Sequence, residues 1–246
     1  MDISYNITLI LLSAIVAVSA GYFTIEMSSE ISLSKGLERW IWLGIGSLTM
    51  GIGIWGMHFI AMTAISTSMN ITYDFITVLI SLLAAIAGCA QGLYIISRPL
   101  INNLILIAAS VSMGAAIAGM HYIGMAAMQM PAKITYDLLV VLLSVIIAIV
   151  VSLAAIKITI FLRGRRHNKQ YFIEKSLASL LMGGAVLSMH YTGMAAAKFQ
   201  FDPSLVIKHT NILDNEAIGL CVGLAVISIF SMVYVFLMNS SLSRSA

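Results

Sequence analysis

The stretch Gly56-Met-His-Phe-Ile-Ala-Met62 recurs twice along the chain, as Gly119-Met-His-Tyr-Ile-Gly-Met125 and as Ser188-Met-His-Tyr-Thr-Gly-Met194. Successive histidines of these motifs are separated by 63 and 69 residues. All three motifs lie inside apolar stretches that are long enough to form membrane-spanning helices. The spacing therefore predicts a repeated unit of two helices, one that carries the motif and one that returns.

The composition of the 246-residue chain predicts a helical membrane protein. Hydrophobic residues make up 60% of the sequence, charged residues 9%, and the mean hydropathy is +1.01. A soluble domain carries about 25% charged residues, so a water-soluble domain, a disordered segment and a disulfide-built secreted module are excluded. The apolar runs last about 20 residues, as membrane helices require, whereas barrel strands alternate over about 10 residues. The net charge of +3 is too small to indicate a nucleic-acid partner.

We predict an all-α polytopic membrane protein with seven transmembrane helices, in which three two-helix repeats follow the first helix. The expected spans are residues 5–27, 40–66, 72–97, 101–128, 135–162, 171–197 and 214–239. They leave no room for a soluble domain, so residues 1–246 are expected to form one domain in the lipid bilayer. Because each repeat is two helices long, all three motif helices cross the membrane in the same direction.

The basic residues predict the orientation of the chain. Those expected on one side are Lys35, Arg39, Arg98, Lys157, Arg163, Arg165, Arg166, Lys169, Lys175 and Arg244, and those on the other side are Lys133, Lys198 and Lys208. By the positive-inside rule, ten against three indicates an N-terminus outside and a C-terminus in the cytoplasm. The run from Arg163 to Lys169 is interpreted as a topology anchor, with docking of a cytoplasmic partner or anionic lipid as the alternative.

Three histidines, His58, His121 and His190, are predicted to lie in one layer near the outer face. Each lies about seven residues before the outer end of its span, which places it about 10 Å below the helix end. Each has a methionine four positions later on the same helix face, and another directly before it. The first set is Met62, Met125 and Met194, and the second set is Met57, Met120 and Met189.

Imidazole and thioether form a ligand set that selects copper, especially the cuprous ion, over calcium, magnesium or manganese. We therefore predict that the three histidines are the primary ligands of one or more copper ions. The methionines four positions later are the preferred sulfur ligands, and those directly before the histidines are the second choice. The alternative is a packing layer of histidines that hydrogen-bond across helices and methionines that fill space. Three copies at matched depth favour the metal, because ionisable groups inside a membrane are usually functional.

Other residues of the repeat are expected to support the helices. The small residues that precede the motifs include Gly51, Gly114 and Gly183, and the aromatic residues that follow the histidines are Phe59, Tyr122 and Tyr191. Small residues let helices approach closely, and the aromatic residues are expected to pack or to donate hydrogen bonds around the site.

A Thr-Tyr-Asp triplet follows the first two motifs at equal distance, as Thr72–Asp74 and Thr135–Asp137, and Phe199–Asp202 is a weaker echo after the third. Threonine as the N-cap with aspartate in the first turn is the expected role, and an outer shell around the metal is the alternative. The residues outside the repeat that are expected to face water or the membrane interface are Glu26, His167 and His209.

The whole chain resembles the bacterial MHYT-domain family, because Met189-His-Tyr-Thr192 is the family signature. Met120-His-Tyr-Ile123 and Met57-His-Phe-Ile60 depart from it in the last one or two positions. The resemblance implies a multi-pass sensor of the bacterial inner membrane that binds copper through the motif histidines and methionines. It also implies dioxygen, carbon monoxide or nitric oxide as signals, and a cytoplasmic diguanylate cyclase, phosphodiesterase or histidine kinase as output.

The expected function is therefore a copper-binding sensor of diatomic gases or redox state that signals to a cytoplasmic partner. Because the chain ends about seven residues after the last expected span, we expect no catalytic output domain in it and no enzyme activity. Three alternatives stay open: a metal or small-solute transporter, a membrane redox or haem protein, and a lipid-binding module. The nearly apolar inner halves of the spans argue against the transporter.

Overall fold

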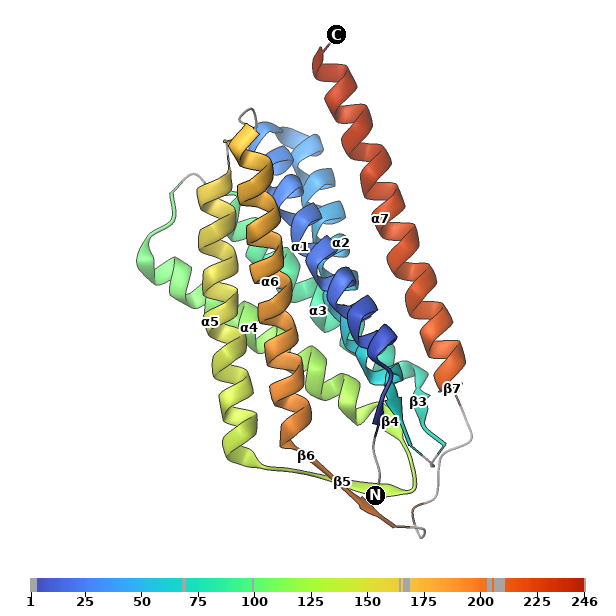
Figure 1. Cartoon of the computed structure of the whole chain (residues 1–246). Coiled ribbons are helices and arrows are strands. Elements are labelled where there is room, and N and C mark those ends of the chain that lie inside the picture. Colours follow the sequence, from blue (N-terminus) through green and yellow to red (C-terminus); the bar gives the residue numbers. More distant parts are fainter. Residues whose placement is uncertain are drawn as a thin grey trace.

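The computed structural model of the protein describes residues 4–67, 70–98, 100–163, 165, 169–202, 205 and 211–245. Its helices are α1 (Ile7–Leu33), α2 (Gly36–Thr63), α3 (Phe75–Ile96), α4 (Asn103–Ala126), α5 (Leu138–Leu162), α6 (Lys169–Ala196) and α7 (Asn215–Ser245). All seven are long and apolar enough to cross a membrane, which confirms the predicted seven-span, all-α class (Figure 1). The predicted positions of Arg166, His167, Lys208 and His209 lie outside the described residues.

The two ends of the helix bundle differ in structure (Figure 1). One end, the loop end, carries the connections α1–α2, α3–α4 and α5–α6 and the C-terminal end of α7. The other end, the strand end, carries seven short strands. These are β1 (Ser4–Tyr5), β2 (Ile65–Ser66), β3 (Thr72–Asp74), β4 (Met128–Gln129), β5 (Ala132–Tyr136), β6 (Ala197–Phe201) and β7 (Ile212–Asp214).

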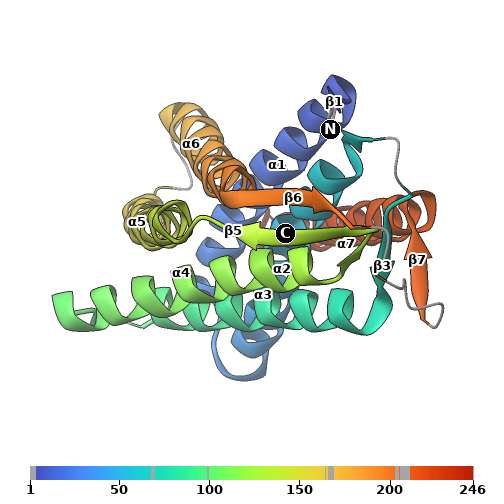
Figure 2. The ribbon, with the colours of Figure 1, turned by 90° about the horizontal axis from the view of Figure 1, so that it is seen from below.

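The strands were not expected from the sequence. They form three small antiparallel sheets, in which β1 pairs with β2, β3 pairs with β4 and β7, and β5 pairs with β6. Seen from the strand end, β5 and β6 lie across the bundle (Figure 2). Backbone N–H and C=O groups beyond the end of a helix have no hydrogen-bond partner within that helix. The sheets supply such partners. Several predicted spans are therefore too long at this end, because the last residues of the motif spans and the first residues of the returning spans belong to strands.

Aspartates, rather than threonines, cap the returning helices. The carboxylate of Asp74 accepts the backbone N–H three residues further on at 2.8 Å, and that of Asp137 accepts the N–H two residues further on at 3.2 Å. Thr72 and Thr135 lie within β3 and β5. The predicted threonine caps are wrong, because the strands extend to the helix starts and leave the capping position to aspartate.

The third returning helix is capped in the same way by Asp214, which accepts the backbone N–H three residues further on at 2.7 Å. The predicted echo Phe199–Asp202 instead completes β6 and the residue after it. At Asp137, the backbone N–H groups of the first helical turn and then the Lys198 ammonium, 3.5 Å away, lower the pKa of the carboxyl group. These interactions make the aspartates helix caps rather than outer-shell groups of a metal site.

Helices α1 to α6 form a closed ring, in which each helix packs against the next and α6 packs against α1. The motif helices α2, α4 and α6 alternate in this ring with α3, α5 and α1. Helix α7 packs outside the ring against α2. The repeat would place α7, as the third returning helix, between α6 and α2, but α1 occupies that place.

Glycines seven residues before the motif histidines bring the backbones of neighbouring helices in this ring close together. A Cβ atom added at any of them would lie less than 3.0 Å from backbone atoms of the neighbouring helix. The pairs are Gly51 with Ile86, Gly114 with Ile149, and Gly183 with Val18. Ile86 of α3 and Ile149 of α5 are equivalent in the repeat, and Val18 of α1 takes the third equivalent place. The predicted packing role of these glycines is thus a contact between the backbone of a motif helix and that of one neighbouring helix.

From the sequence we expected Glu26 to face water or the membrane interface. In the structure it lies instead in a polar cluster near the loop end. Its carboxylate lies 2.7 Å from the ammonium group of Lys175, and the Lys175 side chain is only 8% exposed. The same ammonium lies 3.8 Å from the centre of the Tyr22 ring. A fully buried neighbour, Glu30, accepts a hydrogen bond from Ser240 of α7 at 3.0 Å. Because both carboxylates have partners, α1 continues beyond the predicted end at residue 27.

We predict that Gly183→Ala destabilises the protein and that Gly184→Ala does not. The added methyl group at Gly183 would meet the backbone of Val18 at 2.8–2.9 Å, whereas a Cβ at Gly184 meets nothing within 4 Å. Overpacking should lower the free energy of unfolding by about 1–3 kcal/mol. Alanine at position 184 should leave the free energy unchanged or raise it by up to about 1 kcal/mol.

Unfolding of both variants in detergent, followed by circular dichroism, measures these changes. Equal stability of the two variants would show that the ring does not depend on this contact.

Candidate metal centre

The three motif histidines meet in the interior of the ring, one from each motif helix. His58 and His121 lie five residues before the ends of α2 and α4, and His190 lies six residues before the end of α6. The ring centroids are 5.0, 5.0 and 5.1 Å apart. Their exposed fractions are 0%, 1% and 2%. The predicted single layer of three histidines is therefore present in the fold.

The imidazoles point the same atom, Nδ1, at one another. The Nδ1 atom of His58 lies 3.1 Å from that of His190 and 3.2 Å from that of His121. Two nitrogen ligands of a tetrahedral metal, each about 2.0 Å from the ion, are about 3.3 Å apart. Among the described residues, these three side chains are the only group of three or more His, Cys, Asp or Glu residues that could hold a metal ion.

The opposite ring nitrogens of two histidines have no hydrogen-bond partner. Nε2 of His58 and Nε2 of His121 are buried and unpaired. A Cβ atom added at Gly124 would lie 2.4 Å from the first of these atoms, and one added at Gly193 would lie 2.3 Å from the second. Each imidazole thus rests on a glycine of the next motif helix, three residues after that helix's own histidine. The corresponding residue of the first motif is Ala61.

This arrangement favours a cation at the centre. A neutral imidazole carries one N–H and one lone pair, so the Nδ1 atom of His58 can satisfy only one of its two Nδ1 contacts well. With the hydrogens on Nε2, three lone pairs would face one another in a buried space, and a metal ion would accept all three. The residues present therefore fit a metal ion bound through three Nδ1 atoms.

The surroundings of the histidines favour a low positive charge on that ion. The candidate ligand atoms are neutral, and each imidazole packs edge-on against the aromatic ring of the next residue, Phe59, Tyr122 or Tyr191. The cost of burying an ion rises with its charge, so a site without a carboxylate favours a monovalent ion. The Tyr122 hydroxyl lies 2.6 Å from the Ser144 hydroxyl of α5, which makes it a helix-packing residue rather than a ligand.

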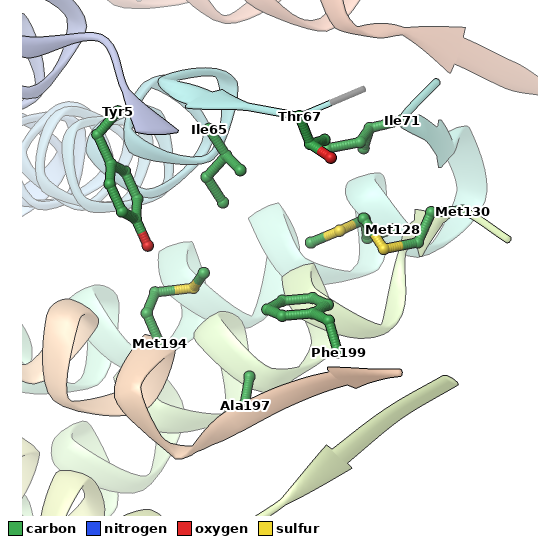
Figure 3. A pocket seen from close by; sticks show the side chains of 9 residues that line it. All are labelled: Tyr5, Ile65, Thr67, Ile71, Met128, Met130, Met194, Ala197 and Phe199. Atoms are coloured by element: carbon green, nitrogen blue, oxygen red, sulfur yellow. The ribbon is translucent and has the colours of Figure 1, made fainter. Parts of the chain in front are cut away.

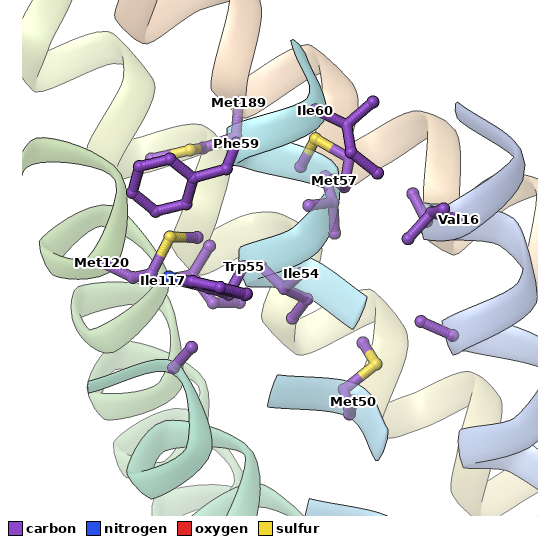
Figure 4. Close-up of a cluster of buried hydrophobic side chains, with 14 of the residues drawn as sticks. Val16, Met50, Ile54, Trp55, Met57, Phe59, Ile60, Ile117, Met120 and Met189 are labelled. Atoms are coloured by element: carbon purple, nitrogen blue, oxygen red, sulfur yellow. The ribbon is translucent and has the colours of Figure 1, made fainter. Parts of the chain in front are cut away.

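The six predicted methionines are all buried, but in different surroundings. Met57, Met120 and Met189 lie among the apolar side chains of the core, near Trp55 and Phe59 (Figure 4). The methionines four residues after the histidines are Met62, Met125 and Met194. They lie in the last turn of their helices, and the first two are 0% exposed. Met194 also lines a pocket at the strand end. The ligand roles of all six sulfurs stay predictions.

The sequence model of the MHYT family, described as the bacterial signalling protein N-terminal repeat, matches three segments, residues 51–109, 114–169 and 183–245. The chain belongs to the MHYT family. Each matched segment begins at one of the three glycines that bring a motif helix into contact with its neighbour. Each of these sequence units thus contains one motif helix with its histidine, although the returning helix of the third unit, α7, lies outside the ring.

Several bacterial signalling proteins are similar to this MHYT chain. The signaling protein YkoW of Bacillus subtilis is 40% identical over 82% of the chain and 25% of its own length. The bifunctional diguanylate cyclase/cyclic di-GMP phosphodiesterase MucR of Pseudomonas aeruginosa is 41% identical over 80% of the chain and 28% of its own length. The cyclic di-GMP phosphodiesterase NbdA of the same organism is 39% identical over 78% and 24%. The chain thus spans about a quarter of these relatives, and no solved structure matches it.

We predict that Gly124→Ala weakens metal binding at the histidines, whereas Gly119→Ala on the same helix does not. The new methyl group at position 124 would lie 2.4 Å from Nε2 of His58 and displace that imidazole, while a Cβ at position 119 meets nothing within 4 Å. Changes around metal-bound histidines typically cost about 10–100-fold in affinity.

Competition with a chelator of known affinity measures the effect. Unchanged affinity in the Gly124→Ala variant would show that the imidazole position is not set by this contact.

Proposed function

We propose that this chain is the sensor domain of a membrane signalling system and binds copper in the cuprous state through His58, His121 and His190. The observation that carries the proposal is the convergence of three buried Nδ1 atoms, with no carboxylate of the described residues in the same group. Imidazole nitrogen suits copper, and neutral ligands in a buried site suit a monovalent ion. Met62, Met125 and Met194 are the preferred candidates for additional sulfur ligands. Met57, Met120 and Met189 are the second choice.

Bound copper would supply a centre that changes its oxidation state or accepts a small additional ligand. An ion held by the three Nδ1 atoms alone would have room for one further ligand, and we propose that a methionine sulfur and a diatomic molecule (dioxygen, carbon monoxide or nitric oxide) compete for that position. The aromatic rings beside the imidazoles would give such uncharged molecules an apolar environment. In the cuprous protein, the stretching frequency of bound carbon monoxide reports whether this position is open.

The alternatives fit the geometry less well. Nδ1 atoms 3.1–3.2 Å apart leave no room for a haem between two histidines. A transporter needs a polar path, and the structure does place Glu26 and Lys175 inside the loop-end half. However, Lys175 lies 15 residues before His190 on α6, which is about 22 Å along the helix. No charged residue occupies α6 between them.

The signalling partner is proposed from the relatives. The names of MucR and NbdA describe cyclic di-GMP enzymes, and this chain matches about a quarter of each. We propose that the chain transmits its signal to a cytoplasmic module of that kind. Helix α7 is the element that leads out of the bundle at the loop end (Figure 1).

The chain is proposed to lie in the bacterial inner membrane with its strand end outside and its loop end in the cytoplasm. Arg165 lies at the loop end and Lys133 in β5 at the strand end, and both are exposed. We predict that a membrane-impermeant maleimide labels Lys133→Cys but not Arg165→Cys in intact cells. Both should react after lysis, and the opposite pattern would reverse the orientation of the site.

We predict that the purified wild-type protein binds about one cuprous ion at the histidine centre, and that the triple His58→Ala, His121→Ala, His190→Ala variant does not, because three Nδ1 ligands are lost. Copper per chain is measured by elemental analysis after loading under reducing conditions, with removal by a strong chelator as the reverse step.

Both proteins must elute as folded monodisperse species, and the single variant His121→Ala serves as a second comparison. Equal copper in wild type and variants would leave the histidines as a packing layer and end the sensor proposal.

A further inference from the structure

A pocket of about 110 Å³ opens at the strand end of the bundle (Figure 3). Its lining residues are Tyr5, Ile65, Thr67, Ile71, Met128, Met130, Met194, Ala197 and Phe199. Three of these nine side chains are methionines, and none is charged. We refer to this cavity as the methionine pocket.

The position of the methionine pocket follows from the repeat. Ile65, Met128 and Ala197 each lie seven residues after a motif histidine, and Thr67, Met130 and Phe199 each lie nine residues after one. All three repeats thus contribute the same two positions to the wall. A cavity to which all three repeats contribute equivalent residues lies near the axis that relates them, and the three histidines surround that axis. The pocket therefore lies above the histidine centre, toward the strand end.

One methionine connects the pocket to the histidine layer. Met194 lies one helical turn beyond His190, which is about 6 Å along α6, and its side chain lines the pocket. Figure 3 shows Met128 and Met130 on the opposite wall from Met194. All three methionines are at most 9% exposed, whereas Tyr5 at the rim is 48% exposed. The sulfur atoms thus lie between the surface of the strand end and the buried imidazoles.

The chemistry of the lining selects a soft monovalent cation. Thioether sulfur binds cuprous and silver ions well and binds calcium, magnesium or zinc poorly. A neutral wall gives no compensation to a divalent ion, because no carboxylate is among the described residues that line the cavity. The side chains of Met128 and Met130 lie outside the repeated heptapeptide motifs, so the histidine centre does not account for them.

We propose that the methionine pocket is a loading site, at which Met128 and Met130 bind a cuprous ion before it passes, by way of Met194 on the opposite wall, to the three histidines. This inference rests on the proposed copper function. In the transfer, bonds from the ion to thioether sulfur break and bonds to Nδ1 form, while the ion stays monovalent and nothing is oxidised or reduced. Thioethers carry no proton to release, so the pocket can bind and release the ion without a change in protonation.

The test compares the loading rate of the full chain in detergent with its final copper content. The test variant is Met128→Leu/Met130→Leu, and the matched control is Met232→Leu/Met238→Leu, which replaces two exposed methionines of α7. Copper is supplied from a coloured cuprous chelator, and the loss of colour is followed by stopped-flow absorbance. We expect loading of the test variant to be about tenfold slower than that of wild type and control, with the same final copper per chain.

An unchanged rate would overturn the loading site while leaving the histidine centre intact. A lower final copper content would also overturn it, because the sulfurs would then belong to the final site.

A second measurement reports on the pocket without the histidines. In the triple histidine-to-alanine variant, silver ion in chloride-free buffer should protect Met128 and Met130 from oxidation by peroxide, and should not protect Met232 or Met238. Mass spectrometry of peptides gives the extent of oxidation at each methionine. Equal oxidation with and without silver would show that the pocket does not bind soft ions. If the proposed copper function is wrong, the wild-type protein will instead contain no copper after loading.

Discussion

The close approach of helix backbones at three equivalent glycines is the constraint on which the rest of the structure depends. Gly51, Gly114 and Gly183 let each motif helix touch its neighbour, and six helices thereby close into a ring. Two helical turns further along, the same helices bring their histidines together. Wider helix spacing would separate the imidazoles, because side chains of fixed length cannot follow the backbone outward. The packing of small residues and the chemistry of the centre are therefore parts of one arrangement.

Much of this arrangement could be predicted from the sequence, because the repeat carries two kinds of information. The apolar runs fix the number of spans, and the equal position of His58, His121 and His190 within their runs places them at one depth. A two-helix period then requires the three to enter from the same direction. The direction of the imidazoles was not predictable, since the Nε2 atoms of His58 and His121 rest on Gly124 and Gly193 of the next motif helix, and only the tertiary structure shows these contacts.

Other features escaped prediction because tertiary partners decide them. The strands form where chain segments far apart in sequence meet, such as β5 and β6, and their residues continue the apolar runs of the helices. Glu26 and Lys175 were each expected near the end of a span, where a charged side chain reaches water or the membrane interface. Their ion pair lets both side chains lie inside the bundle. The place of α1 between α6 and α2 could not be predicted either, because Val18, which contacts Gly183, lies outside the repeat.

The position of α7 outside the ring breaks the equivalence of the three histidines. Gly56 of α2, two residues before His58, lies where an added Cβ would be 2.5 Å from Val226 of α7. A shift of α2 at the centre thus reaches the outgoing helix directly, whereas a shift of α4 or α6 must first move α2 or α1. In the proposed copper site, all three histidines would hold the ion, but only the helix that carries His58 would pass a displacement directly to α7.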